Sequence, residues 1–201
     1  MKWTAEYYRT AIVPKLKEQF GLKNVHQVPR IEKVTVNVGL SKALKDARFM
    51  DIIESSMTRI TGQKPLKTLS RKSIANFKIR EDLPVGMKVT LRGKRMWEFL
   101  DKLLNVSFAR VRDFRGVPES CVDTRGNFSY GFVEQTPFPE ITPDEADLLH
   151  GLQVNLTTTA MTHERGLTLF KLLGVPFSGK GVRVSKPVGR GSAFTGKKHT
   201  K

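Results

Sequence analysis

The sequence is poor in cysteine, in acidic residues and in long apolar runs. Its 201 residues include one cysteine, Cys121, so an internal disulfide and a thiolate metal cluster are excluded. No run of about 18 apolar residues occurs, which argues against a membrane-spanning helix. The first twenty residues also lack the apolar core of a signal peptide. These absences predict a protein of a reducing compartment.

The shortage of acids gives the chain a large positive charge. There are 35 Lys and Arg residues against 19 Asp and Glu residues, for a net charge of +16. Such a field concentrates polyanions, so nucleic acid is the expected partner and a membrane surface the weaker alternative. Residues 178–201 contain no acid and few large apolar residues. We expect one domain over residues 1–177 and a basic tail, disordered in solution, over residues 178–201.

Two segments alternate strictly between apolar and polar side chains, as half-buried strands do. Residues 33–38 (KVTVNV) and 87–92 (MKVTLR) each place three apolar side chains on one face. The opposite face carries side chains that can contact phosphates, sugars and base edges: Lys33, Thr35, Asn37, Lys88, Thr90 and Arg92. An ordinary solvated sheet would show the same alternation. The charge of the chain favours an RNA-binding face.

Apolar spacing elsewhere predicts the remaining elements. Helices are expected over residues 8–20, 46–61, 94–105 and 167–173, strands over 66–69, 127–133 and 152–158, and a loop over 110–126. Pro14 should bend or divide the first helix, and Thr142 begins a capping sequence for a short further helix. The order predicts an α+β fold: a mostly antiparallel sheet with helices on one face and a polar, basic RNA-binding face on the other.

A long basic loop connects two of the predicted strands. Residues 67–80 contain five cations and no acid, and long ordered loops usually serve a function. Phe77 of this loop could stack on a nucleotide or anchor the loop to the body of the protein. The sequence leaves both alternatives open.

An ordered series of motifs resembles the universal ribosomal protein L5 family of the large subunit, in its bacterial form. The motifs run through nearly the whole body and include Val28-Pro29-Arg30, Asn37-Val38-Gly39, Gly62-Gln63-Lys64-Pro65, Phe77-Lys78-Ile79-Arg80, Lys88-Val89-Thr90-Leu91-Arg92-Gly93, Arg112-Asp113-Phe114-Arg115-Gly116 and Phe138-Pro139-Glu140-Ile141. Residues 178–201 depart from the family pattern, which usually ends soon after Pro176-Phe177.

The resemblance implies a non-catalytic ribosomal component that helps attach 5S rRNA in the central protuberance. The implied partners are 5S and 23S rRNA, the P-site tRNA, a small-subunit head protein of the S-thirteen family and other 5S-binding ribosomal proteins. No cofactor, metal, membrane or small-molecule substrate is expected. The implied location is the ribosome, in a bacterial cytoplasm or an organelle.

The matching positions also imply which residues make these contacts. The rRNA-binding residues would be Asn37, Gln63 and Thr90, with Lys33, Lys64, Lys88 and Arg92 around them. The tRNA-binding residues would be Arg71, Lys72, Phe77, Lys78 and Arg80, and Arg112 and Arg115 would contact RNA or form a bridge between subunits. Turn formation is an alternative role for Asn37 and Gln63, which lie next to or near glycines.

Two other functional classes remain open at this point. In an RNA-recognition-motif-like regulator, Phe128, Tyr130 and Phe132 would form an open stacking platform, although we expect these rings in the core. In a metal-dependent nuclease, Asp144, Glu145 and Asp147 would hold the ion, although acids in a first helical turn need no such role. The phosphate-loop-like residues 191–197 (GSAFTGK) lack the Ser or Thr that should follow the lysine.

Overall fold

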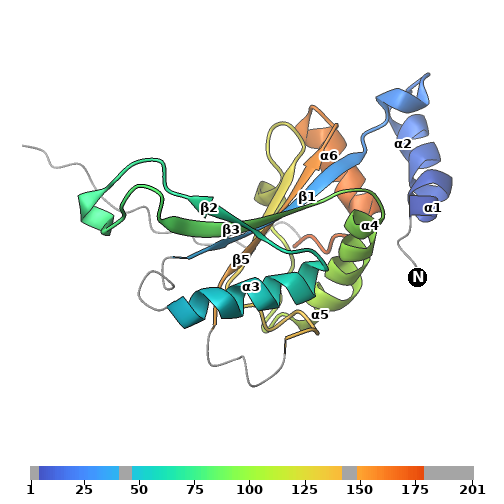
Figure 1. Ribbon diagram of the computed structural model, residues 1–201. Coiled ribbons are helices and arrows are strands. Elements are labelled where there is room, and N and C mark those ends of the chain that lie inside the picture. The colour runs from blue at the N-terminus through green and yellow to red at the C-terminus, as the bar shows by residue number, and fades with distance from the viewer. Residues whose placement is uncertain (1–4, 41–46, 142–148, 179–201) are drawn as a thin grey trace, which may run out of the picture.

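The computed structural model describes residues 5–40, 47–141 and 149–178 and contains a five-stranded antiparallel sheet covered by helices (Figure 1). The strands lie in the order β2-β3-β1-β5-β4, with bounds β1 Ile31–Gly39, β2 Leu66–Leu69, β3 Pro84–Leu91, β4 Phe128–Phe132 and β5 Leu152–Thr158. Each neighbouring pair is antiparallel. The predicted α+β fold is confirmed, and the strands over 66–69 and 152–158 are confirmed at the predicted bounds.

The described helical structure comprises six α-helices, three short 3₁₀ turns and two π-helical segments. The α-helices are α1 Ala5–Tyr7, α2 Val13–Gln19, α3 Ala47–Thr61, α4 Gly93–Lys102, α5 Phe108–Arg110 and α6 His163–Leu172. The 3₁₀ turns are Val25–Gln27, Ala75–Phe77 and Glu119–Cys121. Two π-helical segments, Tyr8–Ile12 and Leu103–Ser107, join α1 to α2 and α4 to α5. The short helix predicted after Thr142 lies outside the described residues.

The core fills the space between one face of the sheet and helices α3, α4 and α6. Val34, Val36 and Val38 of β1 are at most 1% exposed, because their side chains all point to this face. Helix α6 packs against β4 through Phe170 and Phe128, whose ring centroids are 5.2 Å apart. The helices therefore cover one side of the sheet, as the alternation predicted.

Pro14 lies where the hydrogen-bonding pattern of the N-terminal helix changes, and the helix does not end there. The proline lies in the first turn of α2, where its missing N–H costs least. The preceding π segment absorbs the change in hydrogen bonding, because the N–H of Val13 donates to the carbonyl of Tyr8 instead of the residue four back. The helix thereby continues past the proline and still buries Ile12 and Leu16.

The helix predicted over residues 94–105 ends later than predicted. The helix that begins at Gly93 continues through the π segment and α5 and ends at Arg110. Phe108 is 1% exposed and packs edge-on to Tyr130, with centroids 5.3 Å apart. Burial of this ring stabilises a last turn that short-range periodicity does not reveal.

Candidate nucleic-acid interface

The face of the sheet opposite the core carries two rows of hydrogen-bonding side chains. Strand pairing places Asn37 between Lys88 and Gln153, and Thr35 between Thr90 and Asn155. Side chains paired in this way stand about 5 Å apart, so each row is continuous across three strands. We call this surface the polar sheet face; it comprises Lys33, Thr35, Asn37, Lys88, Thr90, Ser129, Gln153, Asn155 and Thr157.

The polar sheet face is open to solvent. Lys88, Thr90 and Gln153 are exposed, and Asn37 is half-buried by its neighbours in the sheet. Asn37 lies in the middle of β1, so the alternative that it serves a turn is wrong. The face offers amide and hydroxyl groups that can donate to and accept from sugars and base edges, with lysines suited to phosphate.

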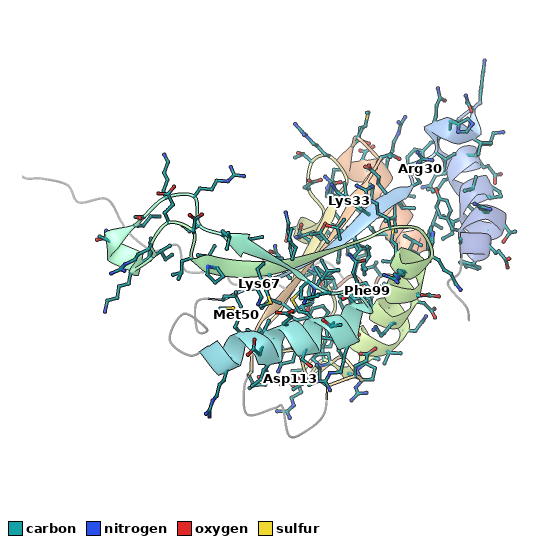
Figure 2. The ribbon with its side chains drawn as sticks, viewed as in Figure 1. Arg30, Lys33, Met50, Lys67, Phe99 and Asp113 are labelled. Atoms are coloured by element: carbon teal, nitrogen blue, oxygen red, sulfur yellow. The ribbon has the colours of Figure 1, made fainter. Side chains whose placement is uncertain are left out.

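Lys33 and Arg92 lie toward the end of this face where β1 begins. Lys33, labelled in Figure 2, follows a bulge in β1. It pairs with Thr157 of β5. Arg92 follows the last residue of β3, and its Nη1 lies 3.7 Å from Glu32 Oε1. Both side chains of this ion pair are at least half exposed. RNA phosphate can therefore compete for Arg92 at little cost.

Gln63 and Lys64 lie in the connection between α3 and β2, not on a strand. The hydroxyl of Thr61 accepts from the N–H of Gln63 and donates to its carbonyl oxygen. The turn thus uses the backbone of Gln63 and leaves the side-chain amide out of these bonds. Lys64 turns toward α3, where its Nζ lies 3.2 Å from Glu54 Oε1.

Glu54 binds two lysines at this edge of the sheet. Lys67 Nζ lies 2.9 Å from Glu54 Oε2, on the other oxygen from Lys64. Hydrogen bonds from Lys67 and then Lys64 hold the pKa of Glu54 below its ordinary value. The charge of Lys64 is therefore partly balanced within the protein, unlike that of Lys88 on the open face.

The basic loop is the tip of an ordered hairpin. Strands β2 and β3 pair with each other in the sheet, and Figure 1 shows their connection projecting away from the body. Backbone hydrogen bonds at Ser70 and between Ile74 and Ile79 close the hairpin on itself. We call residues 70–83 the hairpin tip. Its side chains assigned to tRNA are all exposed: Arg71, Lys72, Phe77, Lys78 and Arg80.

Phe77 does not anchor the loop to the body. Its side chain is 60% exposed, and Ile74 on the same tip is 44% exposed. Lys78 adopts a left-handed conformation with φ of +55°, which ends the short 3₁₀ turn and redirects the chain into β3. An exposed aromatic ring among cations is free to stack on a base.

The aromatic side chains of β4 belong to the core. Phe128 and Phe132 are at most 6% exposed, and Tyr130 is half-buried between their rings. An open stacking platform built from these rings, as a regulator of the RNA-recognition-motif type would need, is therefore absent from β4. The prediction that they lie in the core is confirmed for Phe128 and Phe132.

Catalytic metal chemistry finds no support in the described residues. Nowhere in the ranges 5–40, 47–141 and 149–178 do three His, Cys, Asp or Glu side chains come close enough to hold an ion. No helix within these ranges is sufficiently long and apolar to traverse a bilayer. Asp144, Glu145, Asp147 and the sequence 191–197 lie outside the described residues.

Comparison with known proteins decides the family. The family model described as "Ribosomal protein L5" matches residues 24–80, and a second model, which describes the C-terminus of the same ribosomal family, matches residues 84–177. The chain is 48% identical over 178 residues to the large ribosomal subunit protein uL5 of Halothermothrix orenii, covering 89% of this chain and 99% of the relative. The chain belongs to the ribosomal protein L5 family.

Further relatives agree with this assignment over most of their length. Identity is 51% over 170 residues with the uL5 protein of Synechocystis, and 52% over 170 residues with that of Rubrobacter xylanophilus. Each alignment covers 85% of this chain and 94% of the relative.

Family membership makes the protein a structural constituent of the large ribosomal subunit, located on the ribosome in the cytoplasm. It is not an enzyme, so the nuclease hypothesis is wrong. Ribosomal RNA is its partner as a component of that subunit.

The sheet residues Gln153, Asn155, Thr157 and Ser129 were not among the predicted site residues. Their alternation was visible, but only the pairing of β5 with β1 and β4 brings them to the polar sheet face.

Proposed function

We propose that the polar sheet face binds 5S rRNA and so helps to attach it to the large subunit in the central protuberance. The observation that carries this proposal is the pair of continuous rows centred on Asn37 and Thr35. Folded RNA presents 2′-hydroxyls and unpaired base edges, which amide and hydroxyl side chains can bind. Lys33, Lys88 and Arg92 would contact phosphates around these rows, with Gln63 and Lys64 extending the contact at the edge of the sheet.

Replacement of Asn37 and Thr90 by alanine tests this proposal. Both side chains project from paired strands, so the double variant should keep its fold by circular dichroism. Two lost hydrogen bonds, at about 1 kcal/mol each, should weaken 5S rRNA binding by roughly tenfold or more. Affinity is measured by filter binding at near-physiological salt.

A matched control removes similar groups from elsewhere on the surface. Gln19→Ala with Thr124→Ala changes one amide and one hydroxyl at exposed positions of α2 and of the turn before β4. The control should bind 5S rRNA within about twofold of the unchanged protein. Equal losses in the two double variants would reject the assignment of the polar sheet face.

The hairpin tip is proposed to contact the P-site tRNA. Its support is the projection of the hairpin from the body (Figure 1), the exposure of its four cations and the free ring of Phe77. Cations would bind the phosphates of the tRNA, while Phe77 stacks on an accessible base or ribose edge.

Changing the four cations of the tip to glutamine tests the tRNA contact: Arg71, Lys72, Lys78 and Arg80. Ribosomes assembled with this variant should bind P-site tRNA several-fold more weakly, because phosphate contacts are lost. The matched variant changes Lys15, Lys17, Lys23 and Arg110, four exposed cations elsewhere. Unaltered tRNA binding by the tip variant would refute the proposed contact.

Arg112 and Arg115 are proposed to face RNA or the small-subunit head protein of the S-thirteen family. Phe114 between them stacks on the buried Phe108, with centroids 5.6 Å apart, and so fixes the segment to the core. Both arginines are exposed. Figure 2 labels Asp113, which lies between them, far from Lys33 of the polar sheet face. A second contact surface on this side is compatible with a bridge between subunits.

A further inference from the structure

A cavity of about 290 Å³ opens between the N-terminal helix and the start of β1. Its described lining comes from the α1–α2 helix, the start of β1 with the segment before it, and α4, and includes Tyr8, Arg9, Arg30 and Trp97. None of these residues belongs to the polar sheet face or to the hairpin tip. The cavity is therefore separate from both surfaces discussed above.

Two aromatic rings form one wall of this cavity. The ring centroids of Tyr8 and Trp97 are 5.4 Å apart and the rings are tilted by 37°. The hydroxyl of Tyr8 donates to the carbonyl oxygen of Pro29 at 2.7 Å, which fixes the ring against the chain entering β1. Burial raises the pKa of Tyr8 to about 12, so this hydroxyl stays neutral at physiological pH. The wall is rigid, aromatic and uncharged.

The rim of the cavity is cationic. Arg9 and Arg30 are both exposed, and no Asp or Glu occurs among the described lining residues. Arg30 is held in place by its backbone, since its N–H donates to Thr159 Oγ1 at 3.1 Å. Figure 2 labels Arg30, which lies beside helix α2. The nearby acid Glu32 already pairs with Arg92. The rim is thus suited to an anion.

We propose that this cavity binds one unstacked nucleotide of ribosomal RNA, a second RNA site in addition to the polar sheet face. The base lies against Tyr8 and Trp97, and its phosphate lies between Arg9 and Arg30. The volume falls near the lower limit of small-ligand pockets, about 300 Å³, which suits a single nucleotide. Unpaired RNA bases bind in this way, by stacking on aromatic rings with cations at the backbone. This inference rests on the proposed RNA-binding function.

Fluorescence of Trp97 reads the cavity directly. The chain has two tryptophans, so Trp3→Phe leaves Trp97 as the only one. The probes are an eight-nucleotide uridine RNA, whose bases are unstacked, and an eight-base-pair RNA duplex. The single strand should quench Trp97 and the duplex should not. No quenching at a saturating concentration of the single strand would overturn the proposal.

Variants that remove positive charge test whether Arg9 and Arg30 bind the phosphate of the nucleotide. Arg9→Gln with Arg30→Gln should weaken the quenching interaction about tenfold and reduce its salt slope by about 0.7, the value for one phosphate contact on a single strand. Lys15→Gln with Lys17→Gln removes the same charge from exposed positions of α2 outside the cavity and should change affinity less than threefold. Equal effects of the two variants would mean that bulk charge alone binds the RNA, contrary to the proposal.

Two further measurements separate this proposal from its alternatives. Quenching by an octaglutamate peptide but not by the single strand would assign the cavity to an acidic protein segment and overturn the RNA site. The Asn37→Ala, Thr90→Ala variant should still show quenching of Trp97, because its changes lie on the polar sheet face. If that variant binds 5S rRNA more weakly and no RNA quenches Trp97, only the cavity proposal fails. If that variant binds 5S rRNA as tightly as the unchanged protein and the single strand quenches Trp97, only the sheet-face proposal fails.

Discussion

At the scale of single residues, two glycines allow α6 to pack against the turn before β4. A Cβ added to Gly166 would overlap the Cα of Gly126 and lie 2.6 Å from its carbonyl oxygen. Gly126 itself has φ of +78°, a conformation that favours glycine. The approach is between two backbones, so no flexible side chain can move to relieve it.

Gly166→Ala should therefore destabilise the protein although the position is helical. Helix propensity alone would give about 1 kcal/mol of stabilisation, but the overlap costs up to about 3 kcal/mol, so we expect a net loss of up to about 2 kcal/mol. Urea denaturation measures the change. Gly131→Ala is the control, because its added Cβ meets nothing within 4 Å. A more stable Gly166→Ala variant would contradict the close contact.

Asp123 stabilises the same turn through its carboxylate. It accepts from the backbone N–H of Arg125 at 2.9 Å and of Asn127 at 2.7 Å, and from the side chain of Asn127. Partial burial raises its pKa, but these hydrogen bonds outweigh that effect and hold the pKa below its ordinary value. A depressed pKa means that this stabilisation is complete above the unfolded value, about 3.9, and is lost as the pH falls through the folded value.

Asp123→Ala should lower the free energy of unfolding at pH 7 by about 1 kcal/mol, a small value because the carboxylate is exposed. The difference from the unchanged protein should shrink below about pH 4, where the carboxylate becomes protonated. Urea denaturation over a pH series measures this. Glu18→Ala, which removes a carboxylate from an exposed position of α2, is the matched control.

At the scale of elements, Lys102 of α4 contacts both the C-terminal end of α3 and the segment after β4. Its Nζ lies 2.5 Å from the carbonyl oxygen of Ile60 and 2.5 Å from Glu140 Oε1, so it connects α4 with the end of α3 and the segment after β4. A cation is favourable near the carbonyls at a helix C-terminus. The lysine is mostly buried, with 21% of its side chain exposed.

Lys102→Met should lower the free energy of unfolding by about 2 kcal/mol, because a charged hydrogen-bonding group is lost and Glu140 is left without its cation. Lys94→Met is the matched control on the same helix. Lys94 lies 3.7 Å from Glu98 in an exposed pair, so its replacement should change stability by less than about 0.5 kcal/mol. Thermal or urea denaturation measures the stability of the two variants. Equal losses of stability would show that the contacts of Lys102 with Ile60 and Glu140 do not stabilise the fold.

The elements predicted best from the sequence were those with strict local alternation. Strand β5 needed only the pattern of residues 152–158, and the bounds of β2 were also predicted. The start of α6 at His163 was missed, although Thr162 accepts from the N–H of Arg165 as an N-cap. The extension of α4 to Arg110 depends on the burial of Phe108, a tertiary contact that local spacing does not encode.

The candidate site was predictable only in part, for a related reason. The alternation of β1 and β3 predicted that Asn37 and Thr90 share a face, but the neighbours of β1 depend on long-range strand pairing. The direction of Lys64 toward Glu54 depends on how α3 meets β2. The division of the chain at residue 177 stays a prediction. Ser178, the last described residue, still donates from its N–H to the carbonyl of Val117 at 2.9 Å.

At the scale of the whole molecule, a net charge of +16 attracts any RNA, so selectivity must come from the arrangement of uncharged groups. The polar sheet face supplies such groups on a rigid support, because the opposite side of the same strands is packed against α3, α4 and α6. Preference for one folded RNA over others of equal length is thus the property that separates a built binding surface from bulk charge attraction.

The most direct test compares the affinity of the protein for 5S rRNA, for a transfer RNA and for a scrambled RNA matched in length to 5S rRNA, all at near-physiological salt. Bulk electrostatic attraction is weakened at that ionic strength, so contacts with sugars and bases dominate the comparison. We expect 5S rRNA to bind at least about tenfold more tightly than the scrambled RNA. Equal affinities for all three would contradict the proposal that the polar sheet face recognises 5S rRNA.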